Sequence, residues 1–231
     1  MDTPDAPSWP LSDRSDSGAD HDLASAVAAV EEDIVLNRLA PGARLTEDEL
    51  MARFGMKRHV VREVLAELAR LGLVERRKNL GTVVRLYTER EVVELYAMRE
   101  LLEAEAARGV PCPPAPADLQ RLVAAQEQHD IAVRAENPRL VFHANNTFHQ
   151  TLFGLCGNSV LQKAIEEYSR QTHPMRFPTL VSADYRSRSQ HEHWQMIEAL
   201  RDGQREMLVA LCREHLAPSR DAYLVANRHL F

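Results

Sequence analysis

The sequence has few cysteines and no long apolar run. Its three cysteines, Cys112, Cys156 and Cys212, are odd in number and far apart, which argues against a disulfide framework and against a zinc ribbon. No apolar stretch approaches the roughly 20 residues needed to cross a bilayer, and the N-terminus lacks the basic-then-apolar pattern of a signal peptide. We therefore expect a protein of the reducing cytoplasm with no membrane partner.

Strand-like patterns are also scarce, and they occur in only one part of the 231-residue chain. Residues 1–21 are rich in Asp, Ser and Pro, which is typical of a disordered tail. Residues 22–87 combine helical and strand-like patterns, whereas residues 89–231 have helical patterns only, without internal repeats. We therefore expect a mainly α protein, with a small N-terminal domain followed by an antiparallel bundle of about six helices.

The order of elements in residues 22–87 is that of a winged helix-turn-helix. Thr46 and Glu49 form a capping box that begins a helix, and Gly72 is a stop signal after the third helix. The expected helices of this part cover 22–38, 46–54 and 57–71, and the expected hairpin strands cover 73–77 and 82–85. The helices expected after it lie near 89–108, 116–134, 138–155, 158–173, 184–202 and 203–225.

The net charge of −6 conceals a basic region. Residues 53–85 hold nine basic residues against three acidic ones. Concentrated positive charge is the electrostatic signature of nucleic-acid binding, although solvated surface charge is the simpler interpretation. The charge distribution therefore favours double-stranded DNA as a partner of the N-terminal domain.

The predicted helix 57–71 has the pattern of a DNA-reading helix. Its valines and leucines share one arc, while Arg58 and Arg62, four residues apart, project together from the other face. Arginine can form two parallel hydrogen bonds with guanine or with a phosphate. The hairpin tip would lie over the neighbouring DNA backbone or minor groove. The candidate DNA-contacting residues are Arg44, Lys57, Arg58, His59, Arg62, Arg77, Lys78 and Gly81.

In the helical part, three predicted helices each bring one histidine to their apolar face. These are His149, His193 and His215, and Asn145 lies one helical turn before the first of them. A single buried histidine is usually a hydrogen-bonded core residue, but each unsatisfied buried nitrogen costs about 1–3 kcal/mol. A shared divalent metal would satisfy all three. Imidazole ligands favour zinc, with nickel, iron or copper as alternatives. An additional oxygen ligand would make manganese a further alternative.

Arg99 lies within the apolar stripe of the predicted helix 89–108, where its charge needs a partner. Glu103, one turn further on, is the structural candidate. The functional candidate is the carboxylate of a small effector bound in a cavity beside Arg99. Arg170 is a further candidate for effector binding, as is Arg176.

Two sets of short motifs stand out along the chain. The N-terminal set comprises Leu39–Leu45, Glu49-Leu50, Phe54-Gly55, Val61–Leu65, Leu68, Gly72–Val74 and Gly81–Val84. The C-terminal set comprises Asn145, Phe148-His149, Gly157-Asn158, Glu192-His193, Ile197, Ala199-Leu200, Gly203 and His215-Leu216. The first set resembles the GntR family winged helix over about 34–85, and the second resembles the FCD ligand-binding domain over about 91–224.

The resemblance implies a homodimeric transcription regulator that binds a near-palindromic operator. It also implies a metal held by Asn145, His149, His193 and His215, with a small organic acid completing the coordination. Asparagine stands where the family more often has aspartate, and its amide oxygen is a neutral, weaker ligand. Two alternatives stay open at this point: a metal-dependent hydrolase, and a regulator whose metal is purely structural.

Overall fold

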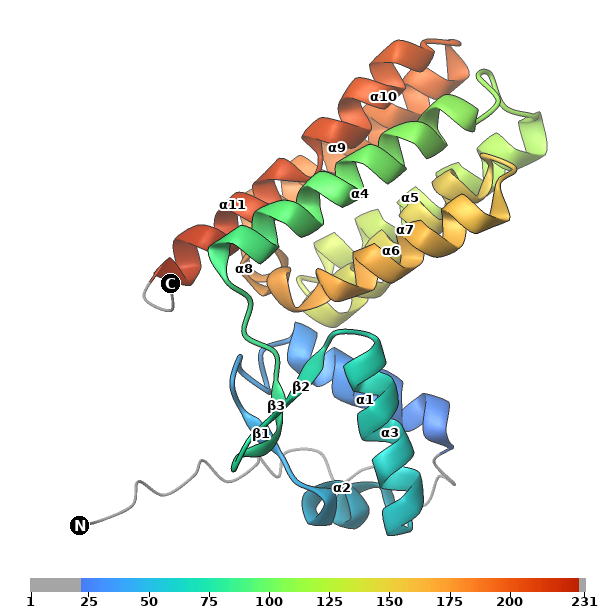
Figure 1. The fold of residues 1–231 in the computed structure, drawn as a ribbon. Coiled ribbons are helices and arrows are strands. Elements are labelled where there is room, and N and C mark those ends of the chain that lie inside the picture. Colours follow the sequence, from blue (N-terminus) through green and yellow to red (C-terminus); the bar gives the residue numbers. More distant parts are fainter. Residues whose placement is uncertain (1–21, 229–231) are drawn as a thin grey trace.

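The computed structural model describes residues 22–228 of the chain. It is mainly helical: a small three-helix unit with a short sheet lies beside a bundle of longer helices (Figure 1). The tail expected at 1–21 lies outside the described residues. Within 22–228, no helix combines the length and apolar character that crossing a membrane requires.

The N-terminal unit has the predicted winged-helix order. A capping box at Thr46 and Glu49 begins the second helix, and Gly72 follows the third helix with a φ of +74°. The sheet order is β1-β3-β2 and all pairs are antiparallel, with Arg44 opposite Val83. Its elements are α1 (Leu23–Val35), β1 (Arg44–Leu45), α2 (Glu47–Phe54), α3 (Arg58–Arg70), β2 (Val74–Arg77) and β3 (Gly81–Val84).

The third strand, β1, is an addition to the predicted hairpin. It consists of only two residues, too few to produce an alternating pattern that the sequence could reveal. Leu68, Leu73 and Val84 are fully buried in the core that α1 and α3 form with the sheet. This core fixes α3 so that its opposite, polar face remains in solvent.

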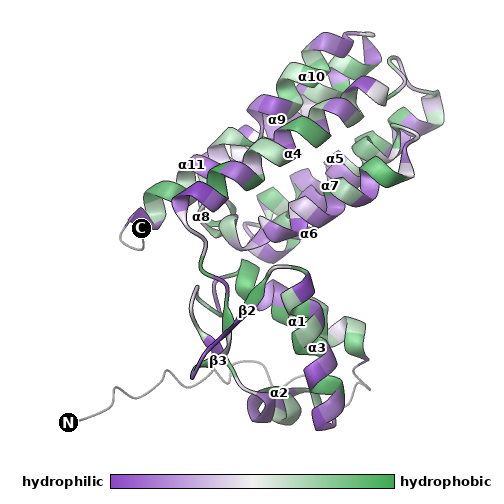
Figure 2. Cartoon of the chain, viewed as in Figure 1, coloured by the Kyte–Doolittle hydropathy of each residue, from purple (hydrophilic) through white to green (hydrophobic). Residues whose placement is uncertain are grey.

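The helical part has more helices than the sequence pattern predicted. Its elements are α4 (Glu89–Gly109), α5 (Pro116–Arg134), α6 (Pro138–Gly154), α7 (Ser159–Gln171), η2 (His173–Met175), α8 (Phe177–Val181), α9 (Ala183–Arg201), α10 (Arg205–Glu214) and α11 (Ala217–Ala226). The single helix expected over 203–225 is divided at His215 and Leu216. Pro218 lies in the first turn of α11, where its missing N–H removes no helical hydrogen bond. Figure 2 shows that the helices carry both hydrophobic and hydrophilic residues, as amphipathic bundle helices do.

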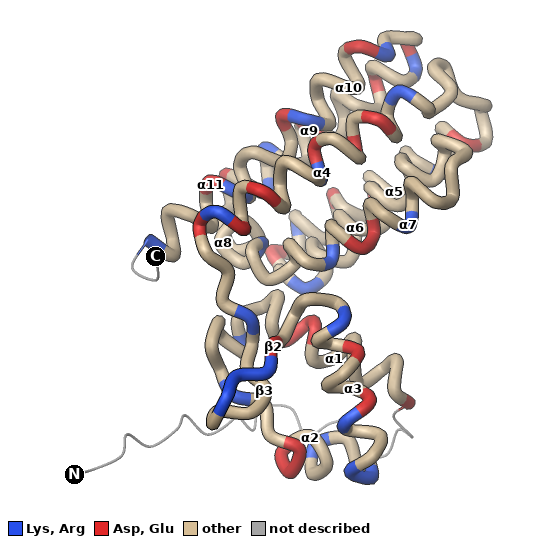
Figure 3. Tube along the Cα trace, in the orientation of Figure 1, with Lys and Arg blue, Asp and Glu red and all other residues tan. Residues whose placement is uncertain are grey.

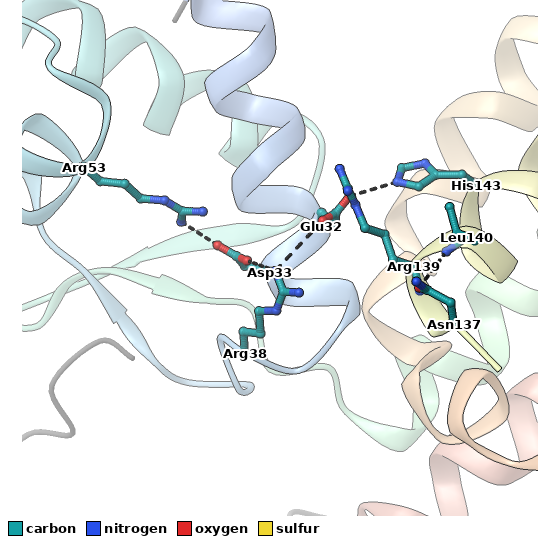
Figure 4. Close-up of polar contacts among 8 residues, drawn as sticks. All are labelled: Glu32, Asp33, Arg38, Arg53, Asn137, Arg139, Leu140 and His143. Carbon is teal, nitrogen blue, oxygen red and sulfur yellow. Dashed lines mark hydrogen bonds and ion pairs between the residues drawn. The ribbon is translucent and has the colours of Figure 1, made fainter. Parts of the chain in front are cut away.

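Polar contacts join the two parts of the molecule. Glu32 on α1 accepts hydrogen bonds from Arg139 at 2.7 Å and lies 2.9 Å from the Nε2 of His143, both on α6 (Figure 4). The hydroxyl of buried Tyr87, in the connecting segment, lies 2.6 Å from the Gly72 carbonyl oxygen. The winged helix is therefore attached to the bundle by side chains as well as by the chain itself.

Candidate functional site

Three histidines from separate segments converge inside the bundle. His149 comes from α6, His193 from α9, and His215 from the junction between α10 and α11. Their candidate ligand atoms all lie within 4.8 Å of one another, and the Nε2 atoms of His149 and His215 are 3.2 Å apart. The break in the predicted last helix therefore falls at one of the converging histidines.

Two of these histidines are oriented by polar neighbours. The Nδ1 of His193 lies 2.7 Å from the Oε1 of Gln126, and the Nδ1 of His215 lies 2.6 Å from the Oε2 of Glu192. A hydrogen bond at Nδ1 fixes the ring orientation and leaves Nε2 for a ligand, which is the usual arrangement around a metal-bound histidine.

The donor set fits a divalent metal ion. Burial lowers the pKa of His149 and of His193 well below the ordinary value, so both rings are neutral and can donate a lone pair. Two nitrogens that share one zinc ion at 2.0–2.1 Å each would be separated by roughly 3.3 Å, close to the 3.2 Å between His149 and His215. Asn145, also largely buried, lies on the same helix one turn before His149.

A fourth histidine belongs to this cluster and was not predicted. His129 on α5 is completely buried, its ring centroid lies 4.9 Å from that of His193, and neither of its nitrogens has a hydrogen-bond partner. Burial lowers its pKa to about 4. The spacing of buried Leu122, Ala125, His129 and Ala132 was the available signal, since it places His129 on the inward stripe of α5.

A cavity of about 70 Å³ adjoins the cluster. Asn145, His129 and His215 line it, as does Arg99 from α4. The guanidinium of Arg99 pairs with Glu103 at 2.7 Å and donates a hydrogen bond to the Thr172 hydroxyl at 2.9 Å. Glu103 therefore neutralises the charge of Arg99. The Arg99 side chain nevertheless borders the cavity, as binding of an effector carboxylate would require.

The two further arginine candidates occupy different places. Arg176 is buried, lines the cavity and donates a hydrogen bond to the Asn146 Oδ1 at 2.8 Å. Arg170 lies outside this cavity, half-exposed, with its Nε 3.5 Å from a carboxylate oxygen of Glu31. The structure therefore brings Arg176, rather than Arg170, beside Arg99.

The candidate DNA-contacting residues are all exposed on the winged helix. Glu47 accepts a hydrogen bond of 2.9 Å from Arg58 and another of 2.9 Å from Arg62, and Asp48 lies 2.7 Å from Arg58. Figure 3 shows basic residues along the hairpin and around the start of α3, at the end of the molecule remote from the bundle. The acidic neighbours hold the two arginines side by side on the open face of α3.

Two family models match separate parts of the chain. The family model "Bacterial regulatory proteins, gntR family" matches residues 24–84, and the FCD domain model matches residues 94–218, more than half of the chain. A repressor of Paenarthrobacter nicotinovorans, described as "Probable D-xylose utilization operon transcriptional repressor", is 29% identical over 211 residues, which are 85% of this chain and 84% of that one.

Solved structures share the fold. A protein described as a GntR transcriptional regulator from Rhodococcus sp. RHA1 is 23% identical, with a TM-score of 0.74 over 88% of this chain and 98% of that one. The McbR/YncC protein of E. coli is 18% identical, with a TM-score of 0.76 over 88% and 97%. The matched families and the curated relative are regulators, which decides against the hydrolase alternative.

Proposed function

The chain belongs to the GntR family of DNA-binding transcription regulators with an FCD domain, and from this premise we propose that a bound divalent metal and a small organic acid in its helical domain modulate operator binding. The observation that carries the proposal is the convergence of His149, His193 and His215 beside a cavity. Outer partners orient two of these rings, as around a resident metal ion.

The metal would be held by the three histidines, with the Asn145 amide oxygen as a fourth ligand. Zinc is our first choice because the nitrogen donors suit it, and nickel, manganese or iron are alternatives. A divalent ion with an open coordination position supplies positive charge that attracts a carboxylate. The residues of this chain would supply the remaining contacts, beginning with Arg99 on the cavity wall.

A short segment connects the cavity with the DNA-binding part. Thr172 accepts a hydrogen bond from Arg99, and Arg176, four residues later, lines the cavity itself. Between them, the Nδ1 of His173 lies 2.8 Å from the Glu31 carboxylate on α1, in a buried contact. A ligand that shifts residues 172–176 would change the support of α1, and thereby the placement of the winged helix.

On the DNA side, Arg58 and Arg62 would contact bases or phosphates in the major groove, and the hairpin would contact the adjacent backbone. We propose a homodimer, because two winged helices related by a twofold axis match a near-palindromic operator. Such a regulator would act in the cytoplasm, where bacterial DNA lies.

The test compares two histidines of α9. His193 is fully buried in the cluster, whereas His191 on the same helix is exposed. We expect His193→Ala to lose bound metal, measured by elemental analysis, and with it the calorimetric signal for carboxylates. His191→Ala should keep both properties.

Two results would contradict the proposal. Metal content that is equal in His193→Ala and in the unaltered protein would remove the metal site. If chelation lowers thermal stability but leaves carboxylate binding intact, the metal is structural and the sensing role assigned to it is wrong.

A further inference from the structure

We infer that the effector carries two anionic groups, and that Arg176 and Arg186 bind the second of them. The inference rests on the proposed function, because it specifies the ligand of the same cavity. A short-chain dicarboxylate is the class of ligand that the cavity fits.

Two of the four arginines on this wall are already neutralised. Arg99 pairs with Glu103 at 2.7 Å, and Arg188 pairs with Glu192 at 2.6 Å. These two ion pairs are electrically neutral, so they add no net positive charge for a second acidic group, although Arg99 still borders the cavity. The four arginines that line the cavity are Arg99, Arg176, Arg186 and Arg188.

The other two arginines are buried without a carboxylate. Arg176 and Arg186 are each 8% exposed, and neither forms an ion pair within residues 22–228. Their hydrogen-bond acceptors are neutral: the Asn146 side chain at 2.8 Å and the Leu180 carbonyl at 2.9 Å. The Nε of Arg186 is buried without any hydrogen-bond partner.

The guanidinium of Arg176 remains positively charged near neutral pH. Burial, and then the charge of Arg99, lower the pKa of Arg176, but only to about 10. A buried charge without a counter-charge is costly, and removing it from water must be offset by a partner. A carboxylate or another anion can satisfy a guanidinium with two parallel hydrogen bonds. The cavity therefore needs a second negative charge, in addition to the one that a bound metal would attract.

The size and polarity of the cavity narrow the ligand class. Its volume of about 70 Å³ is several times the 10–15 Å³ that one water molecule requires, which suits a ligand of few atoms. The His129 ring also borders the cavity, but both of its nitrogens are fully buried, so the guanidinium groups of Arg176 and Arg186 remain the groups that require a partner. Short dicarboxylates meet these conditions.

The test uses pairs of ligands that differ in one charge. Calorimetry on the full-length, zinc-loaded protein would compare succinate with monomethyl succinate, and malonate with monomethyl malonate. We expect each diacid to bind at least about tenfold more tightly than its monoester, as for a charge-assisted hydrogen bond. In Arg186→Gln, the diacid should lose this advantage while the monoester affinity changes by less than about threefold.

Arg201→Gln is the matched control, because Arg201 lies on the same helix α9 but is exposed and outside the cavity. It should leave the affinities of all four ligands unchanged. If Arg186→Gln does not fold, the comparison of diacid with monoester on the unaltered protein still decides whether the effector carries two anionic groups.

Equal affinities for diacid and monoester would overturn this inference and leave the proposed function standing. Failure of every carboxylate to bind the zinc-loaded protein would overturn both. A diacid preference that survives Arg186→Gln in a folded, zinc-loaded variant would overturn the assignment to Arg186.

Discussion

The two parts of the molecule use arginine in opposite ways. On the winged helix, the side chains of Arg58 and Arg62 are 50% and 64% exposed, and acidic residues at the start of α2 hold them in place. In the bundle, Arg99 is 2% exposed and Arg176 and Arg186 are nearly as deeply buried. Exposed arginines bind a large polyanion and are sensitive to salt. Buried arginines require a defined counter-charge. For Arg99 this is Glu103, and we propose that for Arg176 and Arg186 it is a small anionic ligand.

The sharpest test of this contrast is the stability of the buried pair. Arg99→Ala leaves Glu103 buried without its partner and should lower the free energy of unfolding by about 3–5 kcal/mol, measured by urea denaturation. Arg108→Ala on the same helix breaks an exposed pair with Glu105 and should cost less than about 1 kcal/mol. Similar losses in the two variants would show that burial does not distinguish the arginines.

Replacing the exposed arginines of α3 should affect DNA binding and leave stability nearly unchanged. Arg58→Ala and Arg62→Ala should each weaken operator binding by about tenfold to a hundredfold, measured by fluorescence anisotropy, with little change in thermal stability. Arg70, at the other end of α3, pairs with Glu67 and serves as the control. Operator affinities that match the unaltered protein would refute the placement of α3 in the groove.

The contact between the two parts can be tested separately from either site. Glu31→Gln should reduce the change in operator affinity that a carboxylate effector produces by severalfold, because the buried contact with His173 would weaken. Acid affinity itself should change by less than about twofold. Glu32→Gln is the control, since Glu32 contacts α6 rather than residues 172–176. Equal responses in both variants would remove the proposed role of Glu31.

The smallest expected effect concerns the wing. Lys78→Ala should weaken binding to all DNA sequences alike, and should reduce the slope of log affinity against log salt by about 1. Titration of operator and unrelated DNA at several salt concentrations measures both. A loss confined to the operator would instead make Lys78 a base-reading residue.

Local signals in the sequence predicted much of the fold. The capping box at Thr46 and the stop at Gly72 marked the helices of the N-terminal part correctly, because caps and turns depend on nearby residues. The strand β1 was missed because a strand of two residues is too short to show an alternating apolar pattern. The break at His215 was missed because the apolar spacing continues across it. Pro218 was the available local signal, since a proline inside a helix removes a backbone hydrogen bond and is tolerated only in the first turn.

The candidate site was predictable in part for a related reason. Periodicity placed His149, His193 and His215 on inward faces, and the structure brings them together. It could not show which inward faces meet, so His129 on α5 was overlooked. Likewise, the sequence did not show that Arg176 lines the cavity whereas Arg170 lies beside α1. Arg170 lies near the end of α7 and Arg176 lies between η2 and α8, and helical periodicity does not predict side-chain directions at such breaks.

The most direct test of the account is anomalous diffraction at the zinc edge from crystals grown with zinc and malonate. We predict one strong peak among His149, His193 and His215, and malonate density that extends from it to Arg176 and Arg186. A peak elsewhere, with the three histidines hydrogen-bonded only to protein, would contradict the account.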